Sequence, residues 1–159
     1  MVSMRTKRYV RGLMIFMGVL LWTQGTAFAQ EPLTLSKGQK IYIPAYSHIY
    51  TGNRQIPSLL TVTLSIRNTD TSHTIEIVSV DYYDTKGTRI KSYLPTPVSL
   101  KALQSVRYVV DYDDKTGGSG ANFIVEWRSE TPVNPPIMES IMIGSRSSFT
   151  SRGQALITR

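Results

Sequence analysis

Alternating apolar and polar residues run through most of the chain and predict β-strands. Over 60–67 every second residue is a large aliphatic one and the residues between are Thr, Ser or Arg, which is the period of a strand with one buried face. The same alternation recurs over 105–110 and 123–128, and 137–143 is a further apolar segment. No sustained 3.6-residue period occurs after the first 30 residues, so the pattern favours an all-β fold.

The segment 75–83 is strongly β-forming, but its apolar parity shifts near Val78, which predicts a bulge or a strand covered on both faces. Asp84 to Gly87 has the residues of a hairpin turn, and 88–93 would be the return strand. Seven or eight short strands with regular turns are typical of a single antiparallel β-sandwich, immunoglobulin-like or fibronectin-like without the disulfide. A closed barrel is the alternative fold.

The stretch YIPAYSHIY combines aromatic rings, a histidine and a proline at residues 42–50. In a regular strand its aliphatic positions from Ile41 to Ile49 would face the core. Pro44 has no N–H, so the strand is expected to lie at an edge or to be interrupted there. The opposite face would carry an aromatic strip, and an edge strand of this kind could bind a sugar, a peptide strand or another subunit. The strip consists of Tyr42, Tyr46, His48 and Tyr50.

The chain begins like an export signal. Four basic residues and no acid precede an 11-residue apolar run from Gly12 to Trp22, and Ala27-Phe28-Ala29 fits a small-x-small cleavage site. We therefore expect residues 1–29 to be a cleaved signal peptide, and 30–159 to be one exported domain in the periplasm or outside the cell. No transmembrane segment is expected after cleavage.

Charge and composition narrow the function classes. The net charge of +7 falls after cleavage, because 14 basic and 11 acidic residues then give +3. No dense basic stripe remains, so nucleic acid is not an expected partner. The chain has no cysteine, which excludes disulfides, thiol catalysis and iron–sulfur chemistry. From about residue 144 the chain is polar and is expected to be a tail.

Several blocks in the mature part resemble one known family. In chain order they read YIPAYSHIY, LSIRNTD (64–70), VDYYD (80–84), GGSGANF (117–123), MIG (142–144) and SFTSRG (148–153). They are similar to a bacterial family of exported proteins catalogued as a domain of unknown function, number 3124. The resemblance implies an exported envelope or secreted domain and brings no activity, catalytic residue or cofactor with it.

A glycine-rich loop and an acidic cluster are the remaining candidates for chemistry. The loop comprises Gly117, Gly118, Ser119, Gly120 and Asn122, with Ala121 where a serine-hydrolase elbow would have its last glycine. These residues more simply form a tight turn whose exposed backbone a ligand could approach. Just before it, Asp111, Asp113 and Asp114 could hold Ca²⁺, although Lys115 and Asn122 break the EF-hand pattern.

The leading interpretation is a non-catalytic binding or assembly module of the bacterial cell envelope, with no cofactor. Its partner would be an envelope protein or cell-wall glycan, bound by the aromatic strip and the 117–122 loop if the fold brings them together. One alternative is a calcium-dependent glycan-binding protein or hydrolase using residues 111–122. Another is a structural subunit of a homo-oligomer.

Overall fold

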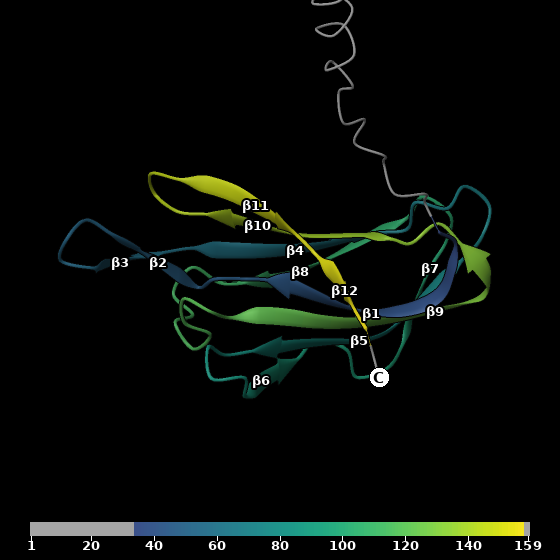
Figure 1. The fold of residues 1–159 in the computed structure, drawn as a ribbon, viewed down its shortest axis with the longest axis horizontal. Helices are drawn as coiled ribbons and strands as arrows, with labels where there is room; N and C mark the ends of the chain where they lie inside the picture. Colours follow the sequence, from purple (N-terminus) through teal and green to yellow (C-terminus); the bar gives the residue numbers. More distant parts are fainter. Residues whose placement is uncertain (1–33, 158–159) are drawn as a thin grey trace, which may run out of the picture. The chain divides into compact units, whose positions relative to one another are not determined.

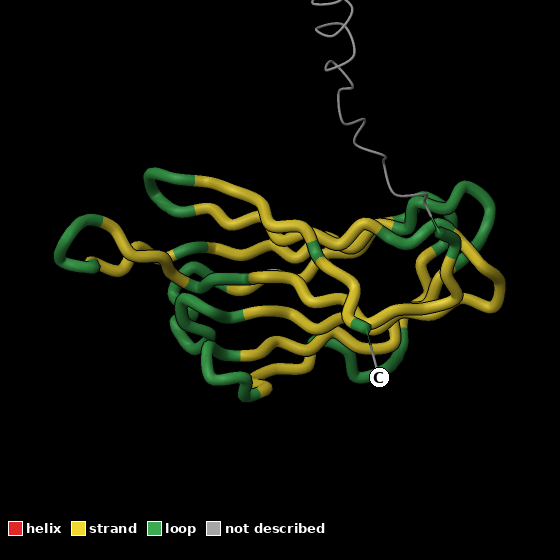
Figure 2. Tube along the Cα trace, in the orientation of Figure 1, coloured by secondary structure: helices red, strands yellow, loops and turns green. Residues whose placement is uncertain are grey.

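The computed structural model describes residues 34–157, and every regular element among them is a β-strand (Figures 1 and 2). The strands are β1 (Ser36–Pro44), β2 (His48–Thr51), β3 (Ile56–Leu59), β4 (Thr61–Arg67), β5 (Ile75–Tyr83), β6 (Arg89–Ser92), β7 (Val98–Leu100), β8 (Ser105–Val110), β9 (Asn122–Val133), β10 (Ile137–Ile143), β11 (Ser148–Arg152) and β12 (Gln154–Leu156). The prediction of an all-β fold is therefore confirmed for this part of the chain. The predicted signal peptide lies outside the described residues.

The strands form two sheets and one separate hairpin, and all strand pairs are antiparallel. The six-stranded sheet has the order β12-β1-β9-β5-β6, with β7 also pairing with β5. The four-stranded sheet has the order β11-β10-β4-β8. The hairpin consists of β2 and β3, which pair only with each other in the described part of the chain.

The two sheets share one hydrophobic core. Every second residue of β4 is buried, as the alternation over 60–67 predicts, and so are the matching positions of β1, β9 and β10. The largest fully buried side chains are Trp127, Tyr82 and Phe123, which come from the six-stranded sheet. Met138 and Met142 of β10 belong to the same cluster from the other sheet. Between residues 34 and 157 there is no helix of the length and hydropathy needed to cross a membrane.

The predicted irregularities of β5 and its turn are present. The register between β5 and β9 shifts between Ile77 and Ser79, so a bulge lies at the point where the apolar parity changes. The turn after β5 is closed by the Asp84 carboxylate, which accepts hydrogen bonds from the backbone N–H groups of Lys86 and Thr88, both at 2.8 Å. Gly87 in this turn has a φ of 80°, which a residue with a side chain rarely adopts.

The segment after Gly144 is more ordered than the expected polar tail. β11 pairs with β10 in one sheet, and β12 pairs with β1 in the other. Gly153 separates the two strands, and its N–H donates to the Met138 carbonyl at 2.8 Å. The chain therefore passes from one sheet to the other at Gly153 (Figure 1). The tail prediction was wrong here because an exposed edge strand needs few apolar residues: in β11 only Phe149 and Ser151 are half-buried.

Candidate binding surface

The alternation predicted for 41–50 is present in the burial of its side chains as far as Ser47, and Ile49, predicted to face the core, is half-buried. Ile41, Ile43, Ala45 and Ser47 are buried, whereas Tyr42, Tyr46 and His48 are half-buried and Tyr50 is 53% exposed. The stretch is not one continuous strand, however. β1 ends at Pro44, and β2 begins at His48, so the interruption expected at the proline occurs.

This interruption divides the aromatic strip into two parts. Tyr42 and Tyr46 stay beside the six-stranded sheet, and the ring of Tyr46 lies 6.4 Å from the ring of Phe149 on β11. His48 and Tyr50 are carried onto the hairpin, where their rings meet edge-on at 5.2 Å and the His48 Nε2 and Tyr50 hydroxyl are 3.3 Å apart. The four residues therefore form two neighbouring groups rather than one row.

The outer face of the six-stranded sheet adds further apolar groups beside Tyr42. In the register of β1, β9 and β5, Tyr42 lies opposite Ile124, and Pro44 and Tyr83 both lie opposite Asn122. At about 4.8 Å between strands and 3.3 Å per residue, the Cα atoms of Tyr42 and Tyr83 are about 12 Å apart. We call the half-buried group on this side of the molecule the aromatic surface: Tyr42, Pro44, Tyr46, Tyr83, Ile124 and Phe149.

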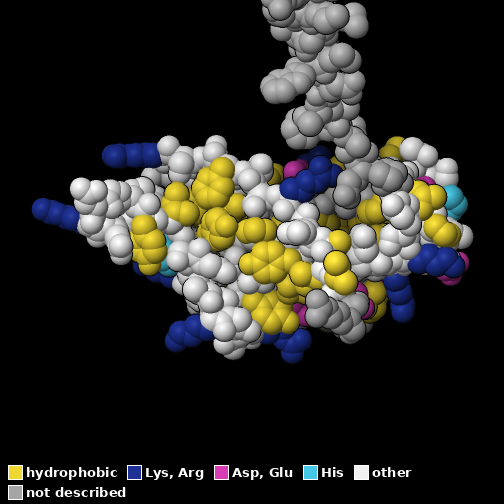
Figure 3. Space-filling model, viewed as in Figure 1, with side chains coloured by type: hydrophobic (Ala, Val, Ile, Leu, Met, Phe, Trp, Pro, Cys, Tyr) yellow, Lys and Arg dark blue, Asp and Glu magenta, His cyan; other side chains and the backbone are white. Residues whose placement is uncertain are grey.

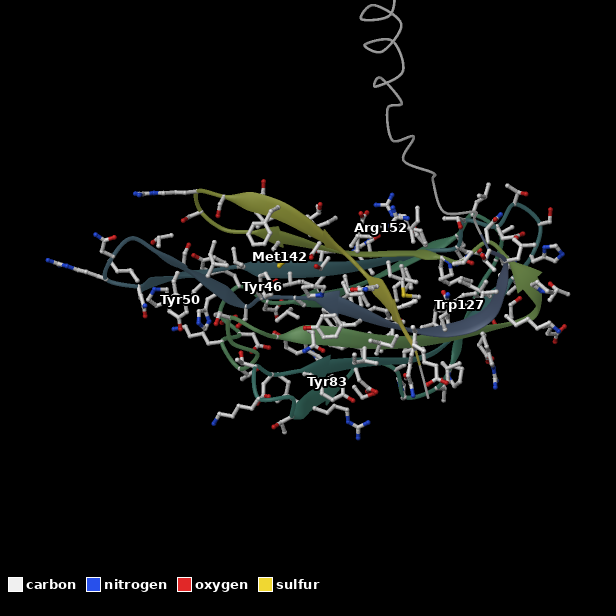
Figure 4. The ribbon with its side chains drawn as sticks, in the orientation of Figure 1. Tyr46, Tyr50, Tyr83, Trp127, Met142 and Arg152 are labelled. Atoms are coloured by element: carbon white, nitrogen blue, oxygen red, sulfur yellow. The ribbon has the colours of Figure 1, made fainter. Side chains whose placement is uncertain are left out.

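Figure 3 shows hydrophobic side chains gathered over this side of the described residues, and Figure 4 places Tyr46 and Tyr83 there. The hairpin extends away from the two sheets at one end of this surface (Figure 1). It exposes Tyr50 and Ile56, of which 53% and 58% are accessible. The two sets of exposed apolar groups therefore adjoin through the segment 45–47.

The glycine-rich loop does lie against the 45–47 segment. The N–H of Ala45 donates to the Ala121 carbonyl at 2.9 Å, and that of Ser47 donates to the Gly118 carbonyl at 3.0 Å. The Ser47 hydroxyl also accepts from the Gly118 N–H at 2.9 Å. On the other side, the Thr85 hydroxyl donates to the Gly117 carbonyl and accepts from the Gly120 N–H, each at 3.0 Å. The loop is thus held between β5 and the start of the hairpin.

Gly117 has no room for a side chain, because it packs on Tyr82. A Cβ at this position would lie 2.0 Å from the Tyr82 hydroxyl oxygen. Burial, with a smaller contribution from the negative charge of Asp114, raises the pKa of Tyr82 well above its usual range. Burial likewise raises the pKa of Tyr93 to about 12, and the Asp114 and Asp111 charges add to the effect. Both phenols therefore stay neutral, and the ring of Tyr82 packs directly against Gly117 of the loop.

The aspartates and the loop serine make separate local contacts. Within 34–157, no three His, Cys, Asp or Glu side chains form a group that could hold a metal ion, Asp111, Asp113 and Asp114 included. The Asp114 carboxylate instead accepts from the N–H of Thr116 at 2.9 Å. The two histidine rings contact Tyr50 and Asp70, and neither contacts Ser119.

The sequence reasoning missed Tyr83, Ile124 and Phe149 as parts of the surface. The signal for Tyr83 is present, since after the bulge Ser79, Asp81 and Tyr83 face outward in alternation with buried Val80 and Tyr82. Ile124 and Phe149 have no such signal. Each reaches the surface only through long-range strand pairing.

Comparison with known proteins gives one family and two distant structural likenesses. A family model described as "Protein of unknown function (DUF3124)" matches residues 38–156. No curated protein matches the sequence. The crystal structure of Thermotoga maritima 1070 has a TM-score of 0.44 at 14% identity, over 76% of this chain and 96% of that one. The crystal structure of FLGD from P. aeruginosa has a TM-score of 0.24 at 17% identity, over 74% of this chain and 71% of that one. At these scores neither likeness bears on function.

Proposed function

The chain belongs to the DUF3124 family of proteins of unknown function, and we propose that it is an exported, non-catalytic module that binds another protein of the bacterial cell envelope. Export is inferred from residues 1–29, which have the basic, apolar and small-residue regions of a signal peptide cleaved after Ala29. The mature domain would then be an immunoglobulin-like β-sandwich in the periplasm or outside the cell.

The hairpin is the observation that carries the proposal. β2 and β3 pair with each other and with no other strand of the described chain, so the outer edge of β2 has unpaired backbone N–H and C=O groups. The outer edge of β3 is the poorer one for strand addition, because Pro57 has no N–H. A two-stranded hairpin is marginally stable by itself, and a third strand that adds to its edge would complete these hydrogen bonds. The expected partner therefore supplies an extended segment.

The aromatic surface supplies the side-chain part of such an interface. Tyrosine is enriched in protein–protein interfaces because it combines a large apolar ring with a polar tip and few rotatable bonds. Tyr42, Tyr46 and Tyr83 are half-buried where they stand, so little conformational entropy remains to be lost on binding. A partner strand on the hairpin edge would continue over these rings.

We favour a protein partner over calcium-dependent glycan binding or hydrolysis, because the free hairpin edge and the aromatic surface both suit a protein chain. The homo-oligomer alternative uses the same hairpin edge with a second copy as the partner. The experiment below separates it from the proposal.

Photo-crosslinking in intact exporting cells tests the proposal. A photoreactive residue replaces Tyr46, Tyr50 or, as control, the exposed Lys86 in the 84–87 turn. We expect positions 46 and 50 to give adducts with the same envelope protein and Lys86 to give none. Adducts between two copies of this chain would replace the proposal by the homo-oligomer. Crosslinks confined to one chain, for example between Tyr46 and β11, would refute both.

A further inference from the structure

The outer face of the four-stranded sheet is unlike the aromatic surface in both charge and chemistry. Its outward side chains are mostly hydroxyls and arginines, with Glu139 as the acid on its four strands. The register places Arg107, Ser65, Glu139 and Arg152 in one row across all four strands. Arg67 lies in the neighbouring row, so three arginines face one glutamate.

The arginines differ in what they contact. Arg67 lies 3.4 Å from the Glu139 carboxylate through its Nη2 and donates from Nε to the Ser65 hydroxyl at 3.0 Å. Arg107 and Arg152, at the two ends of the row, are exposed and form no ion pair within the described residues. Figure 4 labels Arg152 near the point where β11 passes into β12, and its side chain lines a small hollow together with Gln39 and Ala155. The sheet thus holds one satisfied ion pair between two unpaired guanidinium groups.

A shallow hollow lies over β4 and β8, beside Arg67 and Arg107. Its lining is mostly polar, with two aliphatic side chains: Thr63, Ser65, Arg67, Ser105, Val106, Arg107 and Ile141. Arginine presents a planar set of donors that matches carboxylate, while serine and threonine hydroxyls both donate and accept. This combination suits a ligand that carries both carboxylates and hydroxyl groups.

We propose that this face binds a linear polysaccharide that carries carboxylate groups. The Cα atoms of Arg107 and Arg152 are three strand spacings apart, or about 14 Å, so a ligand with carboxylates spaced along its length can pair with both extended side chains. A polymer can place a carboxylate against each arginine and its sugar hydroxyls in the hollow. This proposal is independent of the proposed protein partner, because it uses the other sheet.

A lipid surface is the main competing occupant and fits less well. Attachment to anionic membrane relies on clusters of four to eight basic residues or on apolar side chains that insert. This face has three arginines, of which Arg67 is already paired with Glu139. Its outward aliphatic side chains on β8 and β10, such as Val109 and Ile143, stand beside threonines of β4 and form no continuous apolar patch. Charge and hydroxyl content both favour the polysaccharide.

Fluorescence anisotropy of the full mature protein with labelled oligogalacturonate tests the inference. The oligomer is long enough to span four strands, and labelled dextran is the uncharged control. We expect binding to oligogalacturonate at low salt, weakening as salt is added, and none to dextran. R107S/R152S should weaken the affinity about tenfold, since each exposed arginine–carboxylate pair strengthens binding by a few-fold.

The matched variant R54S/K86S removes the same charge from two exposed loop tips and should change the affinity less than about twofold. R107K/R152K keeps the charge but not the planar donors, so its affinity for oligogalacturonate should lie between those of R107S/R152S and the unaltered protein. Equal weakening in R107S/R152S and R54S/K86S would overturn the inference, as would equal binding of dextran, no binding at low salt, or binding only to phosphatidylglycerol vesicles. None of these results affects crosslinking from Tyr50, so the two proposals fail separately.

Discussion

Replacing Gly117 by alanine should displace the glycine-rich loop from the Tyr82 ring. The added Cβ would lie 2.0 Å from the Tyr82 hydroxyl oxygen, 2.6 Å from Tyr82 Cζ and 2.7 Å from the Ala121 Cβ. All three distances are shorter than a carbon contact can be, so either the loop or the Tyr82 ring must move. Tyr82 is 1% exposed and packs at 5.0 Å against the ring of Phe123, so the ring has little freedom.

The expected cost of Gly117→Ala is that of an overpacked core position, about 1–3 kcal/mol. For a domain of this size each kcal/mol corresponds to about 4 °C, so the melting temperature should fall by about 4–12 °C. Urea unfolding followed by circular dichroism measures the free-energy change, and an unaltered m-value would show that the denatured state is not the cause.

Gly120→Ala is the matched control in the same loop. The nearest atom to its added Cβ would be Thr85 Cγ2 at 3.1 Å. We therefore expect the free energy of unfolding to fall by less than about 1 kcal/mol. Tyr82→Phe should be close to neutral, because its buried hydroxyl makes no short hydrogen bond among the described residues and only a weaker polar contact with Ser47. Combining it with Gly117→Ala should recover part of the loss. If Gly117→Ala is as stable as the unaltered protein, or no worse than Gly120→Ala, the packing argument is wrong.

Three further outcomes follow from the described contacts. The pKa of Asp70 lies well below its usual range because its carboxylate accepts hydrogen bonds from the N–H groups of Ser72 and His73. Asp70→Asn should therefore lower the urea midpoint at pH 7. The difference in midpoint between the two proteins should shrink as the pH falls below about 4, where the carboxyl group of the unfolded chain is already protonated. A pH-independent difference would contradict this assignment. Gly153→Ala should lower the free energy of unfolding by about 1–3 kcal/mol in the same assay, since its Cβ would lie 2.6 Å from Ile41 Cγ2 at the crossing between the sheets. An unchanged free energy would mean that the chain is not tightly packed at this crossing. Added Ca²⁺ should leave the melting temperature unchanged, and a rise would favour the calcium-dependent alternative.

Local patterns predicted the parts of the fold that depend on nearest neighbours. The parity of 60–67, the bulge near Val78 and the turn at Asp84 each follow from the side chains of one short segment, and the structure has all three. The break at Pro44 is of the same kind, because a missing N–H is a property of a single residue.

The remaining features depend on which strands pair, and sequence alone did not supply this. Nothing local indicates that 148–156 crosses from one sheet to the other, because its fit depends on the space that Gly153 leaves beside Ile41. The candidate site shows the same division. The 117–122 loop does meet the 45–47 segment, as the leading interpretation required. Tyr83, which the sequence did not single out, joins the surface because β5 pairs with β9.

The affinity for the partner that crosslinking identifies tests the central claim most directly. Binding of that protein would be measured by titration calorimetry with the unaltered chain, with I56S on the hairpin and with L103S as control. Leu103 is 67% exposed and lies in the loop before β8, outside the proposed interface. We expect I56S to weaken binding at least about tenfold, the effect of losing one apolar anchor, and L103S to leave it unchanged. Equal affinities for all three proteins would contradict the claim that the hairpin and the aromatic surface form the binding site.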